Sequence, residues 1–140
     1  LEAYASGPAI AERAREALSG GEHSSLAEMC GGDLSTLTAA TVYLASKNGD
    51  AVASDVVRET ARILGVGVAN MLNVFNPDVV VLAGGVAQAG DSLFVPLRAE
   101  VSRRAFKPAV DACRIVPGAL GGSAGMVGAV AAFLADHPVE

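Results

Sequence analysis

The chain has 140 residues, of which 51% are hydrophobic and 18% are charged, and its formal net charge is −5. This length and composition predict a single globular domain over residues 1–140 and exclude a disordered chain. The negative charge argues against sequence-independent nucleic-acid binding by this chain, and the apolar run AVAAFLA near its end is too short to cross a membrane.

The first predicted helix begins at Pro8, because proline suits the first helical position and Ser6 and Gly7 can cap the helix end. Its apolar stripe consists of Ile10, Ala14, Ala17 and Leu18. Gly20–Gly21 is expected to end it. The sequence SLAE at 25–28 then has the spacing of a capping box, which predicts a short helical turn.

Two further helices are predicted in the middle of the chain. One covers residues 38–47 and is closed by an Asn-Gly pair. Asp50 caps the next helix, which is long and ends at Asn76–Pro77, because the residue before a proline avoids the helical region. The apolar stripe of this long helix consists of Val57, Ala61, Leu64, Val68 and Leu72.

The second half of the chain alternates between strand and helix. VVVLA at 79–83 is uniformly apolar and begins with three β-branched valines, which is typical of a strand covered on both faces in a parallel sheet. A helix is expected over residues 96–104, a short strand over 114–116 and a last helix over 123–135. This order predicts an α/β fold with more helix than strand and a small, mainly parallel sheet.

Cys30 and Cys113 are the two cysteines of the chain, and they lie far apart without metal-ligand spacing. We expect small buried thiols in a reducing cytosol rather than a disulfide. No metal ligand is predicted in this chain.

Gly84–Gly85 follows the predicted strand, at the end where open α/β sheets bind ligands. Glycines at this place let a ligand approach the backbone and leave amides free to donate, so a nucleotide site and a plain turn are both open. From Gly85 the sequence GVAQAGDS nearly matches a P-loop, but Asp91 stands where the lysine belongs. Because a carboxylate there would repel phosphates, we reject the P-loop.

The sequence GVGVAN at 65–70 begins like a dinucleotide-binding fingerprint but lies inside a predicted helix instead of after a strand. Gly65 and Gly67 therefore allow close packing against a neighbouring helix or, as the weaker alternative, the approach of a ligand.

Several segments together resemble the ROK family of repressors and sugar kinases, and the similarity extends over nearly the whole chain. They are LEAYASGPAIAERAREAL, KNGD, LGVGVANMLNVFNPDVVVLAGGVAQAGDSLFVPL and PGALGGSAGMVGAVAAFLA. The resemblance implies a lobe of the two-lobed actin/hexokinase-like (ribonuclease H-like) ATPase fold. The family includes ATP-dependent sugar kinases such as glucokinase and sugar-responsive transcriptional repressors.

The resemblance also implies roles for particular residues. VLAGGVA would be the adenosine-side loop, with Gly84, Gly85 and Val86 against the nucleotide. Leu1 and Glu2 look like the last two positions of the family's cysteine-rich signature, so Glu2 would bind sugar hydroxyls, which suits a carboxylate. The alternative for Glu2 is a solvated terminal residue. The family's zinc ligands and catalytic aspartate would precede Leu1, so no catalytic residue is predicted here.

These implications predict that the chain is the carboxy-terminal lobe of a cytoplasmic sugar kinase that uses ATP with Mg²⁺. It would be inactive alone, and its partners would be a hexose-type sugar, ATP, its own amino-terminal half and further copies of itself. The sensor lobe of a sugar-responsive repressor is the alternative, and a structural lobe without a ligand site is a third. The sequence does not indicate which sugar is bound.

Overall fold

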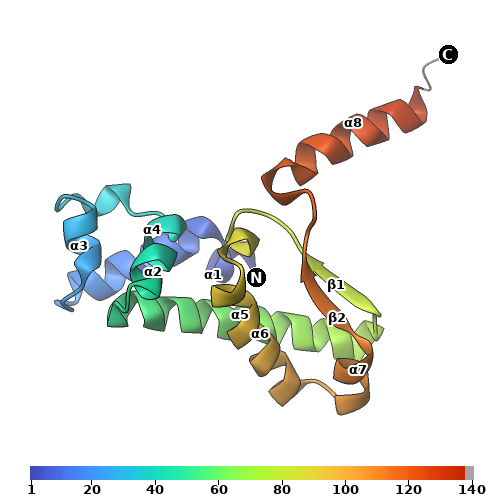
Figure 1. Ribbon diagram of the computed structural model, residues 1–140, viewed down its shortest axis with the longest axis horizontal. Helices are drawn as coiled ribbons and strands as arrows, with labels where there is room; N and C mark the ends of the chain where they lie inside the picture. Colours follow the sequence, from blue (N-terminus) through green and yellow to red (C-terminus); the bar gives the residue numbers. More distant parts are fainter. Residues whose placement is uncertain (138–140) are drawn as a thin grey trace.

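One long helix, α5 (Ala51–Phe75), lies along most of the body of the molecule and contacts elements from both halves of the chain (Figure 1). The structure is a computed structural model that describes residues 1–137. The Asp50 carboxylate accepts a hydrogen bond from the Ala53 amide at the start of α5, over 2.9 Å. Asn76, in the left-handed conformation with φ 46°, ends the helix. The predicted start and end of this helix are therefore confirmed.

Four helices and a 3₁₀ turn precede α5 in the chain. They are α1 (Glu2–Ala5), α2 (Gly7–Ser19), α3 (Ser25–Met29), η1 (Leu34–Thr36) and α4 (Ala39–Lys47). Helices α1, α2 and α4 pack against α5, and α3 packs against α4. Ser6 caps α2, as predicted. The helix predicted at SLAE is also confirmed, but its cap is Ser24 and not Ser25. The shared core of this half consists of Ile10, Ala14, Leu26, Leu37, Val42, Ala45, Ala53, Val56 and Val57.

Asp50 joins α3 to α5. Its second carboxylate oxygen accepts hydrogen bonds from the Ser24 and Ser25 hydroxyls, both over 2.8 Å, and from the Ser25 amide over 2.7 Å. Burial alone would raise the pKa of Asp50, but the hydrogen bonds from Ala53, Ser25 and Ser24 together hold that pKa below its ordinary value. The carboxylate is therefore ionised at neutral pH and caps two helix starts at once.

The second half of the chain forms a small sheet with two helices. Its elements are β1 (Val79–Leu82), η2 (Val86–Ala89), α6 (Asp91–Arg104), α7 (Lys107–Ala112) and β2 (Arg114–Pro117). The two strands pair in parallel, with Val79 opposite Arg114 and Leu82 opposite Pro117. This confirms the predicted α/β class with a small parallel sheet. The core here consists of Ala61, Val68, Ala69, Leu72, Ala87, Leu93, Phe94, Leu97, Val101, Ala109 and Ile115.

Two predictions for this half were wrong. The strand at 79–82 is not covered on both faces, because helices of the described chain cover only one side of the sheet and Val81 is 57% exposed. Helix α6 begins at Asp91, five residues before Pro96. A proline inside a helix removes one backbone hydrogen bond. Burial of Leu93, Phe94 and Leu97 offsets that loss. Helix α7 was not predicted.

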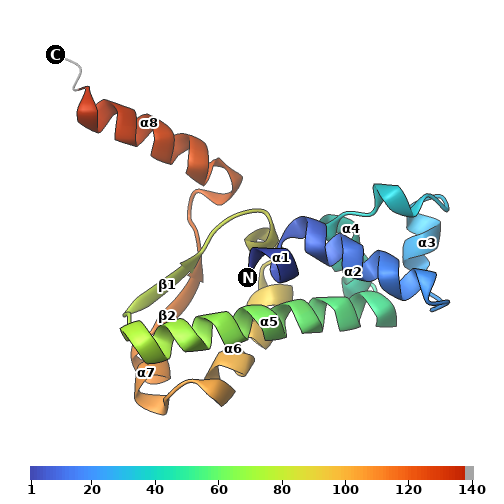
Figure 2. The ribbon, with the colours of Figure 1, turned by 180° about the vertical axis from the view of Figure 1, so that it is seen from behind.

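The last helix, α8 (Ala124–Asp136), follows the turn η3 (Gly121–Ser123) and projects away from the body in both views (Figures 1 and 2). It lies close to its predicted position, but no residue of this fully described helix is buried. Its exposed large apolar side chains are Met126, Val127, Val130, Phe133 and Leu134. Within residues 1–137, no helix has both the length and the apolar character needed to cross a membrane.

Cys30 and Cys113 are free thiols, as expected, although both are partly rather than fully buried.

Candidate functional site

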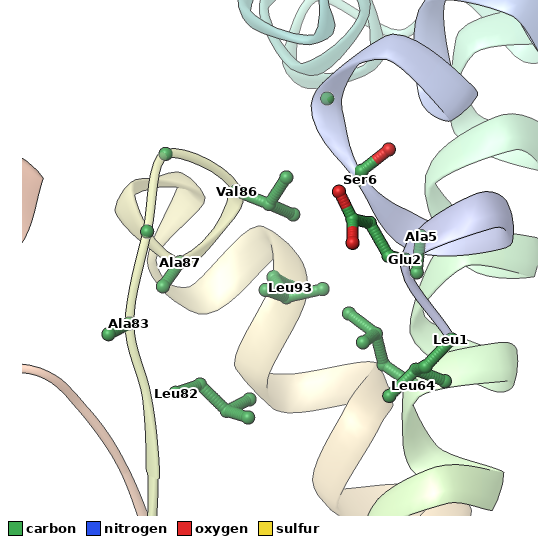
Figure 3. Close-up of a pocket in the computed structure, with 13 residues that line it drawn as sticks. Leu1, Glu2, Ala5, Ser6, Leu64, Leu82, Ala83, Val86, Ala87 and Leu93 are labelled. Atoms are coloured by element: carbon green, nitrogen blue, oxygen red, sulfur yellow. The ribbon is translucent and has the colours of Figure 1, made fainter.

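A cavity of about 340 Å³ lies where the carboxyl end of β1 faces the beginning of the chain (Figure 3). Its lining residues are Leu1, Glu2, Ala5, Ser6, Gly7, Leu64, Leu82, Ala83, Gly84, Gly85, Val86, Ala87 and Leu93. Glu2, Gly84, Gly85 and Val86 were each singled out from the sequence, and the fold brings all four to this one cavity. Most of the wall is apolar, so a small number of polar groups determine what it can bind.

The loop after β1 forms one wall of the cavity. Gly84 has φ +99°, a left-handed conformation that side chains with a Cβ rarely adopt. Gly85 has φ −60° and begins η2, so its backbone alone does not require glycine. A Cβ built on either residue would meet no atom within 4 Å. Both glycines therefore leave open space on the surface of the loop.

Glu2 lies on the opposite wall, on the single helical turn α1. Its side chain points into the cavity beside that of Ser6, across from Val86 (Figure 3). Among the described residues that line the cavity, Glu2 has the only ionisable side chain. A carboxylate in an apolar cavity accepts strong, charge-assisted hydrogen bonds from hydroxyl groups.

A wider groove of about 630 Å³ lies on the other side of the loop, between α2, η2 and the start of α4. Gly85 and Val86 line both the cavity and the groove. Arg15 also lines the groove, and its side chain donates hydrogen bonds to the carbonyl oxygens of Leu34 over 2.9 Å and Leu37 over 3.3 Å. Sequence reasoning missed Arg15, because an arginine on the polar side of a helix carries no distinguishing signal.

Gly65 lies where α5 crosses α6 and is not among the residues that line the cavity, although its neighbour Leu64 is. A Cβ at this position would be 2.7 Å from the Cβ and 2.8 Å from the Cγ of Glu100, and 3.3 Å from the Leu97 carbonyl oxygen. Glu100 itself is 9% exposed and pairs with Arg103 and Arg104. These surroundings favour the close-packing interpretation of Gly65.

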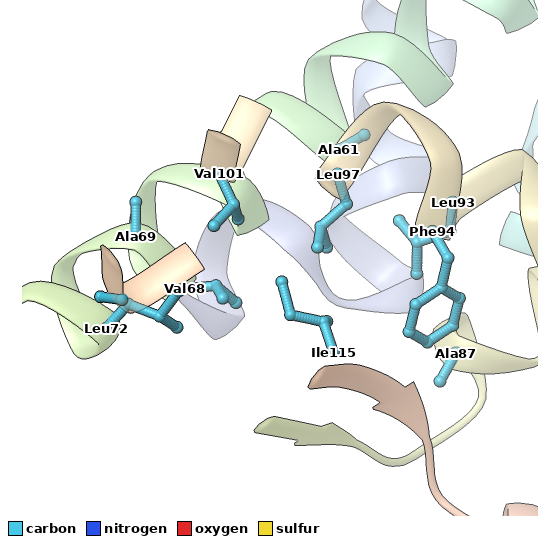
Figure 4. Packing of buried hydrophobic residues seen from close by; sticks show 11 residues of the cluster. Ala61, Val68, Ala69, Leu72, Ala87, Leu93, Phe94, Leu97, Val101 and Ile115 are labelled. Carbon is cyan, nitrogen blue, oxygen red and sulfur yellow. The ribbon is translucent and has the colours of Figure 1, made fainter. Parts of the chain in front are cut away.

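Figure 4 shows the cluster that this crossing buries, with Ala61 and Val68 from α5 and Leu97 and Val101 from α6. Gly67, two residues further along α5 than Gly65, does not itself line the cavity but lies against Leu1, which does. A Cβ there would be 3.1 Å from both methyl groups of Leu1.

The chain is similar to proteins of one family. The model of the ROK family matches residues 1–136. A glucokinase of Halalkalibacterium halodurans is 35% identical over 91% of this chain and 38% of its own length. The DNA-binding transcriptional dual regulator NagC of Escherichia coli is 31% identical over 76% of this chain and 25% of its own length. The chain thus spans less than half of each of these relatives.

Among solved structures, a ROK family glucokinase from Streptomyces griseus, in complex with glucose and AMPPNP, superimposes with a TM-score of 0.80 and 31% identity. The superposition covers 94% of this chain and 43% of the glucokinase. The α/β fold described above therefore matches part of the fold of ROK sugar kinases, which is actin/hexokinase-like.

Proposed function

This chain belongs to the ROK family, and we propose that it forms the part of an ATP-dependent sugar kinase that holds ATP at Gly84, Gly85 and Val86 and a sugar hydroxyl at Glu2. The observation that carries the proposal is the single cavity that joins Glu2 to the glycine loop. Phosphoryl transfer depends mainly on holding the acceptor hydroxyl and the nucleotide next to each other. A site with one partner on each wall meets that requirement.

The loop fits a nucleotide because its surface is open. The space beside Gly84 and Gly85 contains no protein atom that a Cβ would touch, so the phosphates of ATP can approach the backbone there. In this proposal ATP supplies the phosphoryl group and is bound together with Mg²⁺. Gly85 and Val86 also border the wider groove, which offers room for the rest of the nucleotide.

Glu2 fits a hexose because its carboxylate is the charged group in an otherwise apolar lining. It would orient a hydroxyl by accepting its hydrogen bond. The base that removes the hydroxyl proton would come from another part of the protein, as would the zinc site of the family. A cytoplasmic location, where ATP is available, stays a prediction.

The sensor lobe of a sugar-responsive repressor is a second candidate. It is supported by the match to the NagC regulator, which covers 76% of this chain. Such a lobe would keep the sugar contact at Glu2 without transferring a phosphoryl group.

The nucleotide half of the proposal is tested by replacing Gly85 with valine in the protein at its full natural length. Because Gly85 has an ordinary helical φ and open space around it, the valine should leave the melting temperature unchanged. If ATP lies against the loop, the new methyl groups should raise the KM for ATP about tenfold, which corresponds to about 1.4 kcal/mol. An ADP-release assay with glucose measures this.

Gly84→Ala is the matched control for strain. Gly84 has a left-handed backbone, so an alanine there should lower the melting temperature even without a ligand. Unchanged ATP affinity in Gly85→Val would leave the plain turn as the role of the loop. A full-length protein that binds glucose but releases no ADP above background would favour the repressor.

We also propose that the chain is the carboxy-terminal lobe of a longer, two-lobed protein. The superposition covers 94% of this chain but 43% of the Streptomyces griseus glucokinase, so that protein is much longer than this chain. The other lobe would then cover the apolar residues of α8 and the open face of β1.

Without another lobe, this uncovered apolar surface should draw two or more copies of the chain together. At micromolar concentration we expect the 140-residue chain to sediment as a dimer or a larger assembly. Val130→Glu with Phe133→Glu should return it to a monomer of 14.0 kDa, because both side chains are exposed on α8 and contribute nothing to the core. A wild-type chain that sediments as a well-folded monomer would contradict this prediction.

A further inference from the structure

The helical turn that carries Glu2 is held against the rest of the molecule by contacts from other elements. Helix α1 has four residues and no side-chain cap at its start. Its backbone hydrogen bonds are those from the Tyr4 and Ala5 amides to the Leu1 carbonyl, both 3.0 Å, and from the Ser6 amide to the Glu2 carbonyl, 3.1 Å. A single turn adds little stability of its own, so the contacts that α1 makes with other elements help to place Glu2.

One such contact comes from Arg13 on α2. Its guanidinium donates one hydrogen bond to the Tyr4 carbonyl oxygen over 2.6 Å and another to the Thr60 hydroxyl oxygen over 3.0 Å. Thr60 is fully buried in α5, and its own hydroxyl donates to the Val56 carbonyl over 2.8 Å. Arg13 thus links a carbonyl near the end of α1, which lacks a partner within the turn, to the rigid helix α5.

A second contact holds the beginning of α1. The Leu1 side chain rests on α5 at Gly67, where both of its methyl groups lie 3.1 Å from the place that a Cβ would take. Because Gly67 has no side chain, Leu1 lies closer to α5 than it could if any other residue occupied position 67. The residue held in this way immediately precedes Glu2.

We propose that Arg13 and Gly67 are positioning residues, which clamp the two ends of α1 onto α5 and so fix the Glu2 carboxylate in the cavity. Neither lines the cavity. Arg13 acts through the Tyr4 carbonyl, and Gly67 acts through the Leu1 side chain. The consequence for a sugar rests on the function proposed above. Since a displacement of about 1 Å can reduce catalysis up to a hundredfold, a loosened α1 should weaken sugar use even with Glu2 intact.

The clamp itself can be tested without any ligand, by hydrogen–deuterium exchange in the full-length protein. In Arg13→Met, amide exchange over residues 2–6 should become about tenfold faster, whereas exchange over residues 10–18 of α2 should stay unchanged. Arg13→Lys keeps the charge and can make one of the two hydrogen bonds, so its exchange should be intermediate. Arg58→Met is the control, since Arg58 is exposed and pairs with Asp55 on its own helix. Unchanged exchange over residues 2–6 in Arg13→Met would overturn the proposal.

The action through Glu2 is tested by a double-mutant cycle with Glu2→Gln. Arg13→Met alone should raise the sugar KM about tenfold and leave the KM for ATP unchanged. When Arg13→Met is combined with Glu2→Gln, it should raise the sugar KM less than twofold further, because the carboxylate that Arg13 positions is already lost. Fully additive effects would overturn positioning through Glu2. If Glu2→Gln alone left the sugar KM unchanged, the proposed sugar contact would fail, and amide exchange would still decide whether the clamp exists.

Discussion

Gly65→Val should destabilise the protein by about 3 kcal/mol, the upper end of what overpacking a core costs. The reason is the contact between α5 and α6, which are packed so closely at Gly65 that a Cβ would overlap the Cβ of Glu100 at 2.7 Å. The Cβ of Glu100 cannot move away without its helix, and the Leu97 carbonyl oxygen, a backbone atom, would also be close at 3.3 Å. The helices must therefore separate, which exposes core residues and disturbs the pairing of Glu100 with Arg103 and Arg104.

Thermal unfolding followed by circular dichroism measures the effect, which should be a fall in melting temperature of roughly 10 °C. Gly67→Ala is the control for stability on the same helix, because a Cβ there would meet only the Leu1 side chain, which can move away while α5 and α6 stay packed, although α1 then loses its contact at Gly67. Alanine is the better helix former by up to about 1 kcal/mol, so this variant should melt at the same temperature or higher. If Gly65→Val melted normally but bound ATP weakly, the ligand-facing interpretation of Gly65 would replace the packing one.

Glu2→Gln should raise the KM for the sugar by about 10- to 150-fold and spare that for ATP. This corresponds to the loss of about 1.5–3 kcal/mol expected when a charged hydrogen-bond partner is removed. Glutamine has nearly the same shape as glutamate, so the fold of α1 should survive while the charge-assisted acceptor is lost. Steady-state kinetics of the full-length protein with glucose and ATP separates the two KM values.

Glu16→Gln provides the control, because it is the same change at an exposed position on α2, outside the cavity lining. It should leave both KM values unchanged. An effect of Glu2→Gln on ATP alone would place Glu2 beside the nucleotide. No effect on either substrate would mean that Glu2 is a solvated residue without a ligand.

Several features of the fold could be predicted because they depend on neighbouring residues. Ser6, Asp50 and Asn76 lie at helix ends, where side-chain caps or a left-handed backbone complete the hydrogen bonding within a few residues. The apolar run at 79–82, with three β-branched valines, forms a strand for the same kind of local reason. The order of these elements was enough to predict the α/β class.

The errors arose where distant contacts override local preference. Pro96 lies inside α6 because Leu93, Phe94 and Leu97 gain more from burial against the rest of the core than the missing hydrogen bond costs. The exposure of one face of β1 could not be predicted from VVVLA. An apolar strand sequence indicates that both faces suit burial, but it does not indicate which part of a protein covers them.

The sequence by itself determined the positions of most helices and strands, the family, and the identity of Glu2 and Gly84–Gly85 as candidates, because each depends on local chemistry or on the order of motifs. Only the tertiary structure decided that Glu2 and the glycine loop face each other across one cavity. The tertiary structure alone also decided that Gly65 lies against Glu100 and that Arg13 reaches Tyr4 and Thr60. These relations join residues far apart in the chain, and their geometry exists only when the helices have packed onto α5.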